Sequence, residues 1–316
     1  MDHAQPAPDG PSTDDQAPAP APVCFRHAGR ESYVRCSRCD RHVCPDCRRE
    51  AAVGYQCVEC VKSGQQGVRR ARTAFGGRIT SRPYGTIGLI VLNVAGYLAE
   101  IAGGQDFVNR FAMLGLGVLR PADPESWDGV SPLPVGGVAH GEWYRLITGC
   151  FLHQQPTEAP FGVAHLLMNM YWLWMLGRVV EDRLGVLRMV ALYLLSALGG
   201  SALTLLFAPH ALTVGASGAV FGLVGGYRVL SRRQGYDPLG GDQLMVFFIV
   251  WMVVSAGFAS WTGHLGGLLA GLAAGAALAY APREQRGTVQ AILLTAVLAL
   301  IAVAAVIGVD RLVPIS

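Results

Sequence analysis

The sequence has few charged residues for its length. Of its 316 residues, 15% are charged and 52% are hydrophobic, whereas about a quarter of the residues in a soluble globular domain are charged. This scarcity excludes an ordinary soluble enzyme and indicates an all-α polytopic membrane protein. The formal net charge of +3 says little about partners, because the charges are segregated along the chain. We expect no nucleic-acid partner.

Cysteine is nearly absent outside one short segment. Seven of the eight cysteines lie between Cys24 and Cys60, and Cys150 stands alone. Four pairs of ligand-type residues, each with two residues between the partners, occupy this segment: Cys24/His27, Cys36/Cys39, Cys44/Cys47 and Cys57/Cys60. Eight ligands are enough for two tetrahedral zinc sites. The short gap between the second and third pairs favours an interleaved arrangement, first pair with third and second with fourth.

Zinc is not the only interpretation of this segment. Disulfides, a redox-active pair and an iron–sulfur cluster are the alternatives, and zinc is favoured because the topology below places the segment in a reducing compartment. We expect about two structural Zn²⁺ ions that fold a small domain, and no metal in catalysis. His42 is left over and is expected to be a surface residue. The segment resembles B-box and RING-like cross-braced zinc modules, although its spacing differs from the usual B-box pattern.

The start of the chain lacks the basic and then apolar pattern of a signal peptide. Residues 1–22 hold six prolines, four acidic residues and no large apolar residue after Met1. We therefore expect no cleavable signal peptide. A segment of this composition cannot bury enough apolar surface to offset its ordering entropy, so we expect a disordered tail.

Long apolar runs, in contrast, are frequent. We expect seven membrane spans, at about 84–102, 163–177, 186–207, 217–230, 243–259, 261–280 and 288–308. The segment 103–162 is expected to form a partly embedded loop. A basic linker at 63–83 precedes the first span, and the loops near 209–210 and 259–260 carry no Lys or Arg. By the positive-inside rule, the N-terminus is cytoplasmic and the C-terminus lies outside. Basic residues beside a membrane also favour anionic lipid headgroups, so the zinc module can contact either the bilayer or a cytoplasmic partner.

Few strongly polar side chains lie inside the spans. Burying such a side chain in a membrane costs free energy, so its presence indicates function. His165 and Asn169, Ser217, and His264 lie near the outer ends of three spans that run inward. From Ser217 the chain reaches its next arginines within 11 to 16 residues. A helix of that length covers only about 16–24 Å of a roughly 30 Å hydrocarbon core. The helix at Ser217 is therefore predicted to begin below the outer membrane face, beside water.

Glycines at three- and four-residue spacing follow both Ser217 and His264. Such glycines let two helix backbones approach closely in lipid, which would bring the serine hydroxyl within hydrogen-bond reach of the imidazole. A histidine base activates serine as a nucleophile. We expect no Asp or Glu to accompany the pair inside the core spans, so a dyad is expected rather than a triad. Phe221, one turn after the serine, could pack against the imidazole.

His165 and Asn169 are four residues apart and share one helix face. With the Ser217 N–H they could stabilise a tetrahedral oxyanion. Each feature also has a purely structural interpretation, since glycine-flanked serines often serve packing and a His-x-x-x-Asn pair can join helices. The coincidence of all of them at one membrane face favours the catalytic hypothesis.

The residues resemble those of rhomboid intramembrane serine proteases. The matching segments are 142–145 with 151–153, 165–170, Gly177 with Glu181 and Gly185, 215–219, and 263–267 with Gly271. The resemblance implies a six-helix bundle at 84–281, with Ser217 as nucleophile, His264 as general base, and His165 and Asn169 beside the oxyanion. It also implies cleavage of transmembrane protein substrates near the extracytoplasmic membrane boundary. Arg145 and Glu181 would be structural.

The sequence departs from the family pattern in three ways. Phe221 stands where some members carry Tyr, and eleven residues separate His153 from His165. The seventh span adds one helix, so 282–316 completes a six-plus-one form. Together with the zinc-binding module at 23–62, this form is similar to actinobacterial rhomboids and implies a multi-pass protein of the cell membrane.

Two other functions are compatible with a polar site in a helix bundle. A catalytically silent rhomboid-like binder or chaperone would recognise transmembrane clients, but it needs none of the four polar residues that are present together. A transporter predicts inverted repeats, and the two halves of the sequence show no such symmetry. An intramembrane endopeptidase is the favoured prediction.

Overall fold

The computed structural model describes residues 20–66, 71–119, 135–158 and 161–313. The chain divides into two compact units, Met1–Arg70 and Ala71–Ser316. Most of the expected disordered tail, together with residues 67–70 of the expected linker, lies outside the described residues.

The first unit is small and is held together by cysteine. Its elements are β1 (Val23–Cys24), β2 (His27–Glu31), β3 (Arg48–Glu50), β4 (Tyr55–Cys57) and α1 (Val58–Gln66). The strands form two antiparallel pairs, β1 with β2 and β3 with β4. The buried residues of its core are six cysteines and Val43. A unit of this size buries too little apolar surface to fold on that basis alone, so its stability depends on what the cysteines bind.

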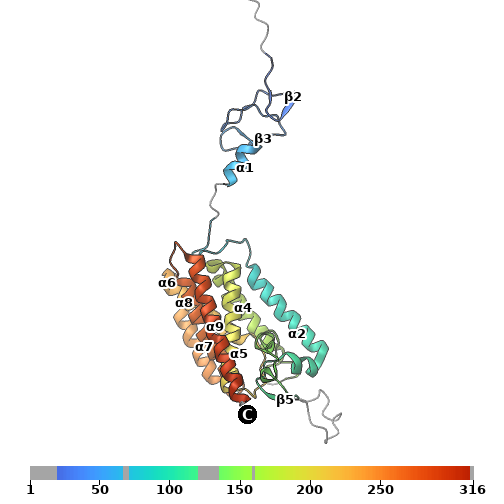
Figure 1. Ribbon diagram of the computed structural model, residues 1–316, viewed down its shortest axis with the longest axis vertical. Helices are drawn as coiled ribbons and strands as arrows, with labels where there is room; N and C mark the ends of the chain where they lie inside the picture. The colour runs from blue at the N-terminus through green and yellow to red at the C-terminus, as the bar shows by residue number, and fades with distance from the viewer. Residues whose placement is uncertain (1–19, 67–70, 120–134, 159–160, 314–316) are drawn as a thin grey trace, which may run out of the picture. The chain divides into compact units, whose positions relative to one another are not determined.

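The second unit is a bundle of long helices, with its core between them (Figure 1). They are α2 (Tyr84–Phe111), α4 (Val163–Leu184), α5 (Val186–Phe207), α6 (Ser217–Gln234), α7 (Gly241–Val254), α8 (Trp261–Ala279) and α9 (Arg286–Leu312). Among the described residues, each of the seven predicted spans coincides with one of these helices. The predicted fold class, a helical membrane bundle with one added helix, is confirmed.

Four of these helices are long and apolar enough to cross a membrane: α2, α5, α8 and α9. The helix α7 is apolar but has only 14 residues. The helices α4 and α6, which carry His165 and Ser217, are not among these four.

Glycine brings α5, α6 and α8 into backbone contact. A Cβ added to Gly267 of α8 would lie 2.0 Å from the carbonyl oxygen of Gly218 in α6, and one on Gly271 would lie 2.1 Å from that of Gly222. On the α5 side, a Cβ on Gly266 would lie 2.4 Å from the Gly199 oxygen. Real Cβ atoms do not approach oxygen so closely, so these positions accept only glycine. The close approach fixes the register between the helix starts at Ser217 and Trp261.

The helix α6 is longer than its charges suggest. Arg228 lies three turns into α6, is buried, and donates from Nε to Asp242 Oδ1 of α7 at 2.6 Å. Because its charge is paired with the largely exposed carboxylate of Asp242, the arginine does not mark the helix end, and α6 continues to Gln234. The helix therefore has 18 residues, against 19 in α8.

The segment between the first two predicted spans packs against the bundle. The helix α2 runs past its predicted end to Phe111, with a break at Gly104 (φ 60°). After it come β5 (Gly117–Val118), β6 (Val135–Gly136), the 3₁₀ turn η2 (Val138–His140), α3 (Arg145–Thr148) and the turn η3 (Gly149–Phe151). Residues 120–134 and 159–160 of this stretch lie outside the described residues.

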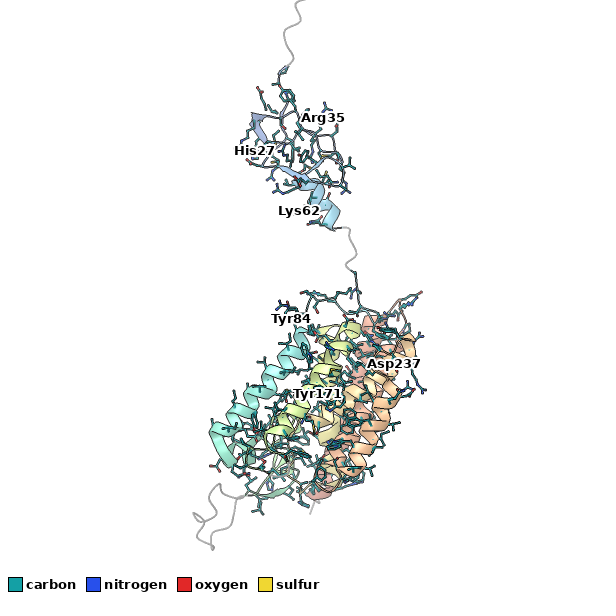
Figure 2. All side chains as sticks on the ribbon, turned by 180° about the vertical axis from the view of Figure 1, so that it is seen from behind. His27, Arg35, Lys62, Tyr84, Tyr171 and Asp237 are labelled. Atoms are coloured by element: carbon teal, nitrogen blue, oxygen red, sulfur yellow. The ribbon has the colours of Figure 1, made fainter. Side chains whose placement is uncertain are left out.

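Two charged residues brace the bundle, as the resemblance implies. Arg145 is fully buried, and it donates to the Ala112 oxygen at 2.8 Å and to Glu142 at 2.7 Å. Glu181 of α4 accepts the backbone N–H groups of Gly85 and Thr86 at 2.9 and 2.8 Å. These N–H groups are free at the start of any helix, so Glu181 satisfies the N-terminus of α2. Figure 2 shows that end of α2, marked by Tyr84, at the same end of the bundle as Asp237, with Tyr171 nearer the middle.

Candidate active site and metal centres

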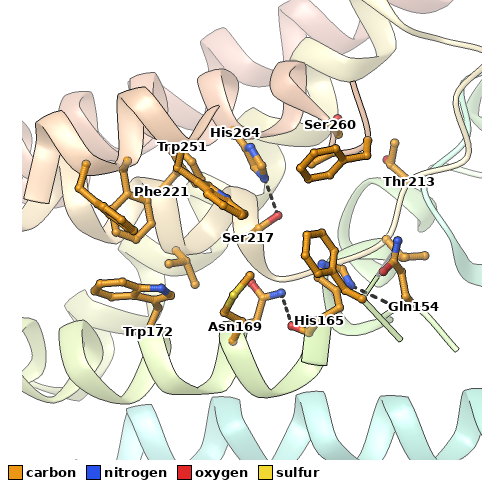
Figure 3. Close-up of a pocket in the computed structure, with 18 of the residues that line it drawn as sticks. Gln154, His165, Asn169, Trp172, Thr213, Ser217, Phe221, Trp251, Ser260 and His264 are labelled. Carbon is orange, nitrogen blue, oxygen red and sulfur yellow. Dashed lines mark hydrogen bonds between the residues drawn. The ribbon is translucent and has the colours of Figure 1, made fainter. Parts of the chain in front are cut away.

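Ser217 and His264 meet across the α6–α8 contact (Figure 3). The distance from His264 Nε2 to Ser217 Oγ is 2.9 Å, a normal hydrogen-bond length. His264 is 3% exposed and Ser217 is half-buried. The two side chains come from separate helices whose glycines allow this approach, and they form a unit of nucleophile and base within hydrogen-bond reach.

A glycine turn sets the position of Ser217 at the start of α6. Gly215 has φ 126°, and its N–H donates to the Gly149 oxygen at 3.0 Å. A Cβ at Gly215 would lie 2.8 Å from His165 Cε1, so a side chain here would collide with the ring. The next residue, Ala216, is fully buried. Ser217 is the first residue of α6, where backbone N–H groups have no partner within the helix and attract negative charge.

Aromatic packing holds the imidazole. The Phe221 ring stacks on His264 with 4.2 Å between centroids and 9° between planes, as the one-turn spacing predicts. Phe248 of α7 then meets Phe221 edge-on at 4.9 Å. Among the described residues, His264 Nδ1 has no hydrogen-bond partner. The base is therefore oriented by stacking rather than by a carboxylate, which is the arrangement of a dyad.

His165 and Asn169 lie on α4 and line the same cavity as the dyad. The Asn169 amide nitrogen donates to the His165 carbonyl oxygen at 2.9 Å, so one of its two N–H bonds goes to its own helix. This contact fixes the side chain and leaves its second N–H for the cavity. His165 Nδ1 accepts a hydrogen bond from the Gln154 N–H at 3.2 Å.

The cavity has a volume of about 230 Å³. Its polar floor consists of the dyad and the α4 pair. Much of its wall is aromatic or apolar and comes from α4, α7 and neighbouring loops: Phe161, Met168, Trp172, Phe247, Phe248, Trp251 and Phe258. Such a lining fits an apolar chain segment above a small polar centre.

Sequence reasoning missed part of this site. It assigned no role to Gln154. This residue acts through its backbone N–H, which nearly every residue type has, so its identity gives no signal. It also passed over Glu100, which lies inside the first predicted span and is fully buried. A carboxylate in an apolar span is itself a signal, so this residue could have been found.

The eight expected metal ligands form two groups in the first unit. One contains Cys24, His27, Cys44 and Cys47, and the other contains Cys36, Cys39, Cys57 and Cys60, with all ligand atoms in each group within 4.8 Å of one another. First and third pairs join, as do second and fourth, which is the interleaved pattern favoured by the spacing. His42 is half-buried and belongs to neither group.

The distances within both groups match tetrahedral zinc. Around one Zn²⁺, sulfur atoms at about 2.3 Å lie ~3.8 Å apart, and a sulfur lies ~3.6 Å from a ligating nitrogen. His27 Nδ1 lies 3.4 Å from the sulfurs of Cys44 and Cys47, and the Cys39 and Cys57 sulfurs are 3.8 Å apart. These separations exceed a disulfide bond of about 2.05 Å, and all the described cysteines are free thiols.

Arg41 favours the metal-binding form of one ligand. Its Nε lies 3.3 Å from Cys39 Sγ, and this donor lowers the pKa of the Cys39 thiol. A metal binds the thiolate, not the thiol. The donor set and its geometry therefore fit two structural metal sites that keep no open coordination position.

Comparison with known proteins shows a similarity that is confined to the second unit. Residues 140–281 match the Rhomboid domain family. The rhomboid protease GluP of Bacillus subtilis is 38% identical over 147 residues, which cover 45% of this chain and 27% of that protein. RHOMBOID-like protein 6, mitochondrial, of Arabidopsis thaliana is 34% identical over 152 residues, which cover 46% of this chain and 47% of that protein. RHOMBOID-like protein 4 of the same plant is 47% identical over 85 residues, which cover 27% of this chain and 20% of that protein.

The chain is therefore similar to rhomboid proteins over residues 140–281, and four of its helices are long and apolar enough to cross a membrane. The matched region spans between about a fifth and half of the length of these relatives. It contains both Ser217 and His264, together with His165 and Asn169. The Cys/His unit lies outside the matched residues.

Proposed function

We propose that this protein is an intramembrane serine endopeptidase that cleaves transmembrane protein substrates with a Ser217–His264 dyad. The observation that carries the proposal is the 2.9 Å contact between the serine oxygen and the imidazole nitrogen, inside a cavity of an apolar helix bundle. The match of residues 140–281 to the Rhomboid domain supports it, as does the similarity to the rhomboid protease GluP.

The reaction proceeds in two halves. His264 Nε2 takes the proton of Ser217 Oγ while that oxygen attacks a peptide carbonyl, and the same nitrogen then protonates the leaving amine as the C–N bond breaks. Water attacks the resulting ester with His264 again as base, which releases the new carboxyl terminus and returns the proton to the serine. The stack with Phe221 keeps the ring in place through both halves.

The oxyanion forms between α4 and the start of α6. We assign its stabilisation to the Ser217 N–H, the His165 ring and the free amide N–H of Asn169, all of which border the cavity. One donor of this kind commonly contributes about 2.7–4 kcal/mol to the transition state. The donors are fixed before the substrate arrives, so they need little reorganisation.

A substrate must present an extended peptide bond to this centre. A transmembrane helix has all its backbone groups paired internally, so it has to unwind locally before Ser217 can attack. We therefore expect substrate segments that hold a helix weakly, and the aromatic wall of the cavity favours apolar side chains beside the bond that is cut.

We also propose the arrangement in the membrane and the role of the metal sites. The N-terminal unit lies in the cytoplasm and the C-terminus outside the cell membrane, because basic residues flank the expected inner ends of the spans. Residues 23–62 bind two structural Zn²⁺ ions through the eight Cys and His ligands. Residues 84–281 form the protease core, and α9 is the added seventh helix.

Labelling with a serine-directed probe tests the nucleophile. A fluorophosphonate or isocoumarin should label Ser217 of the full-length protein in detergent, because His264 activates that oxygen. Ser217→Ala should abolish labelling and His264→Ala should reduce it strongly, whereas Ser231→Ala, a serine of the same helix that contacts Arg183 instead, should leave it unchanged. Equal labelling of wild type and Ser217→Ala would refute the assignment.

A further inference from the structure

A backbone donor determines where His165 carries its proton. The Gln154 N–H points at His165 Nδ1 at 3.2 Å. A backbone amide can only donate, so Nδ1 must be the acceptor and carries no hydrogen. A neutral imidazole has one N–H, and here it must lie on Nε2. The tautomer of His165 is thus set by a neighbouring peptide group.

The Nε2 edge of His165 faces the nucleophile. The position that a Cβ of Gly215 would occupy lies 3.0 Å from His165 Nε2 and 3.7 Å from Ser217 Oγ. The ring nitrogen and the serine oxygen therefore border the same small space. In Figure 3 the two side chains approach one another from α4 and α6, with Gln154 on the far side of the ring. The tautomer that the Gln154 amide imposes is the one that can donate towards Ser217.

The segment that carries this amide is anchored by Glu100. Glu100 Oε2 of α2 accepts the N–H of His153 at 2.9 Å, and both residues are fully buried. The His153 ring meets His165 edge-on at 5.2 Å between centroids, and it meets Tyr97 of α2 at 6.4 Å. Since His153 directly precedes Gln154, the carboxylate holds the peptide unit next to the one that donates to His165.

We propose that Glu100 is a positioning residue for the proteolytic site, acting through the 153–154 backbone to hold His165 as its Nε2–H tautomer. Glu100 is not one of the residues that line the cavity, and its effect passes through two backbone hydrogen bonds. The inference rests on the proposed function for its kinetic consequence, but the tautomer itself does not depend on catalysis.

Two substitutions at Glu100 distinguish the effect of its hydrogen-bond acceptor from the effect of its negative charge. Glu100→Gln keeps an acceptor oxygen for His153, and the other carboxylate oxygen has no hydrogen-bond partner among the described residues. Glu100→Leu keeps the approximate shape and removes the acceptor. We expect kcat to fall about 10–100-fold in the leucine variant with KM within about twofold, as for the loss of an oriented donor. The glutamine variant should stay within about threefold of wild type.

Glu284 supplies a control. It is an exposed carboxylate of the turn between α8 and α9 and lines neither the cavity nor the 153–154 segment. Glu284→Leu should leave kcat within about twofold of wild type. If Glu100→Leu does not fold, Glu100→Asp replaces it, since the shorter side chain withdraws the acceptor and should lower kcat in the same way.

The decisive readout is the tautomer of His165. Nitrogen NMR of full-length protein labelled with ¹⁵N-histidine, with the His165 signals assigned from a His165→Asn sample, should show a single Nε2–H tautomer in wild type and in Glu100→Gln. Glu100→Leu or Glu100→Asp should show a mixture. An Nδ1–H tautomer in wild type, or an unchanged tautomer and kcat in those two variants, would overturn the proposal. If Ser217 proved not to be a nucleophile, the proposed function would fail while the tautomer result stood.

Discussion

A buried imidazole needs something to hold it, and here an aromatic ring does so. Phe221 stacks on His264 at 4.2 Å, and Phe248 supports Phe221 from the next helix. Ring pairs of this kind contribute about 0.5–1.5 kcal/mol beyond the area they bury. A carboxylate in the same place would have to be desolvated in the membrane. Stacking orients the base without adding a charge to the bundle.

At the level of single residues, the sequence predicts what depends on residue type. Serine and histidine among glycines, and a phenylalanine one turn later, are visible in the chain and lie together in the structure. The orientation of Asn169 is not visible, because it depends on a hydrogen bond to a carbonyl of its own helix. The backbone donor to His165 cannot be read from the sequence either, because any residue except proline at position 154 would supply the same N–H.

Among the helices, the contact of α6 with α8 matters most for the site. Their glycines leave no room for a Cβ at Gly267 or Gly271, so the helices touch through their backbones. Lipid supplies no hydrophobic force between helices, and close packing of small residues takes its place. A shift of about an ångström between α6 and α8 would break the hydrogen bond between Ser217 and His264.

A single methyl group in this contact should therefore impair both stability and activity. Gly271→Ala places a Cβ 2.1 Å from the Gly222 oxygen, which forces the backbones apart at a cost of about 1–3 kcal/mol. We expect a lower midpoint of thermal unfolding in detergent and a loss of substrate cleavage. Gly88→Ala in α2, where a Cβ meets nothing within 4 Å, is the control and should change neither. Equal stability of both variants would show that the contact tolerates a side chain.

Helix positions follow from the sequence better than helix ends do. Apolar runs locate all seven long helices of the described chain, because lipid-facing and buried positions are both apolar. The span that starts at Ser217 is predicted to end at about residue 230, whereas α6 continues to Gln234, with Arg228 paired to Asp242 of α7. The end of α2 was placed early because Gly104 breaks the helix without ending it. Both depend on contacts or conformations that composition does not record.

The whole molecule joins two units with different sources of stability. The membrane unit buries a large apolar core between helices, whereas the small unit buries little besides its cysteines. The two Cys/His groups that could bind metal belong entirely to the small unit, and the Ser217–His264 pair belongs entirely to the other. Folding of the first unit should therefore depend on metal, and the chemistry of the second should not.

Metal analysis and chelation test this division. Purified full-length protein should contain about two zinc ions per chain, and replacing both Cys36 and Cys39 with serine should halve that number, because each group of four ligands binds one ion. A chelator should remove the metal and unfold the small unit, as followed by protease sensitivity of residues 20–66. Cleavage of a reconstituted substrate should persist. A wild-type protein without metal, or cleavage that stops with chelation alone, would contradict this account.

The most direct test is cleavage of a model transmembrane substrate in proteoliposomes, with the cut mapped by mass spectrometry. Wild-type protein should cut within the apolar segment near its extracytoplasmic boundary, at a site with small or helix-weak residues. Ser217→Ala and His264→Ala should fold, as judged by unchanged thermal unfolding, and should give no product. Undiminished cleavage by both variants, or a cut confined to the soluble part of the substrate, would contradict the central claim.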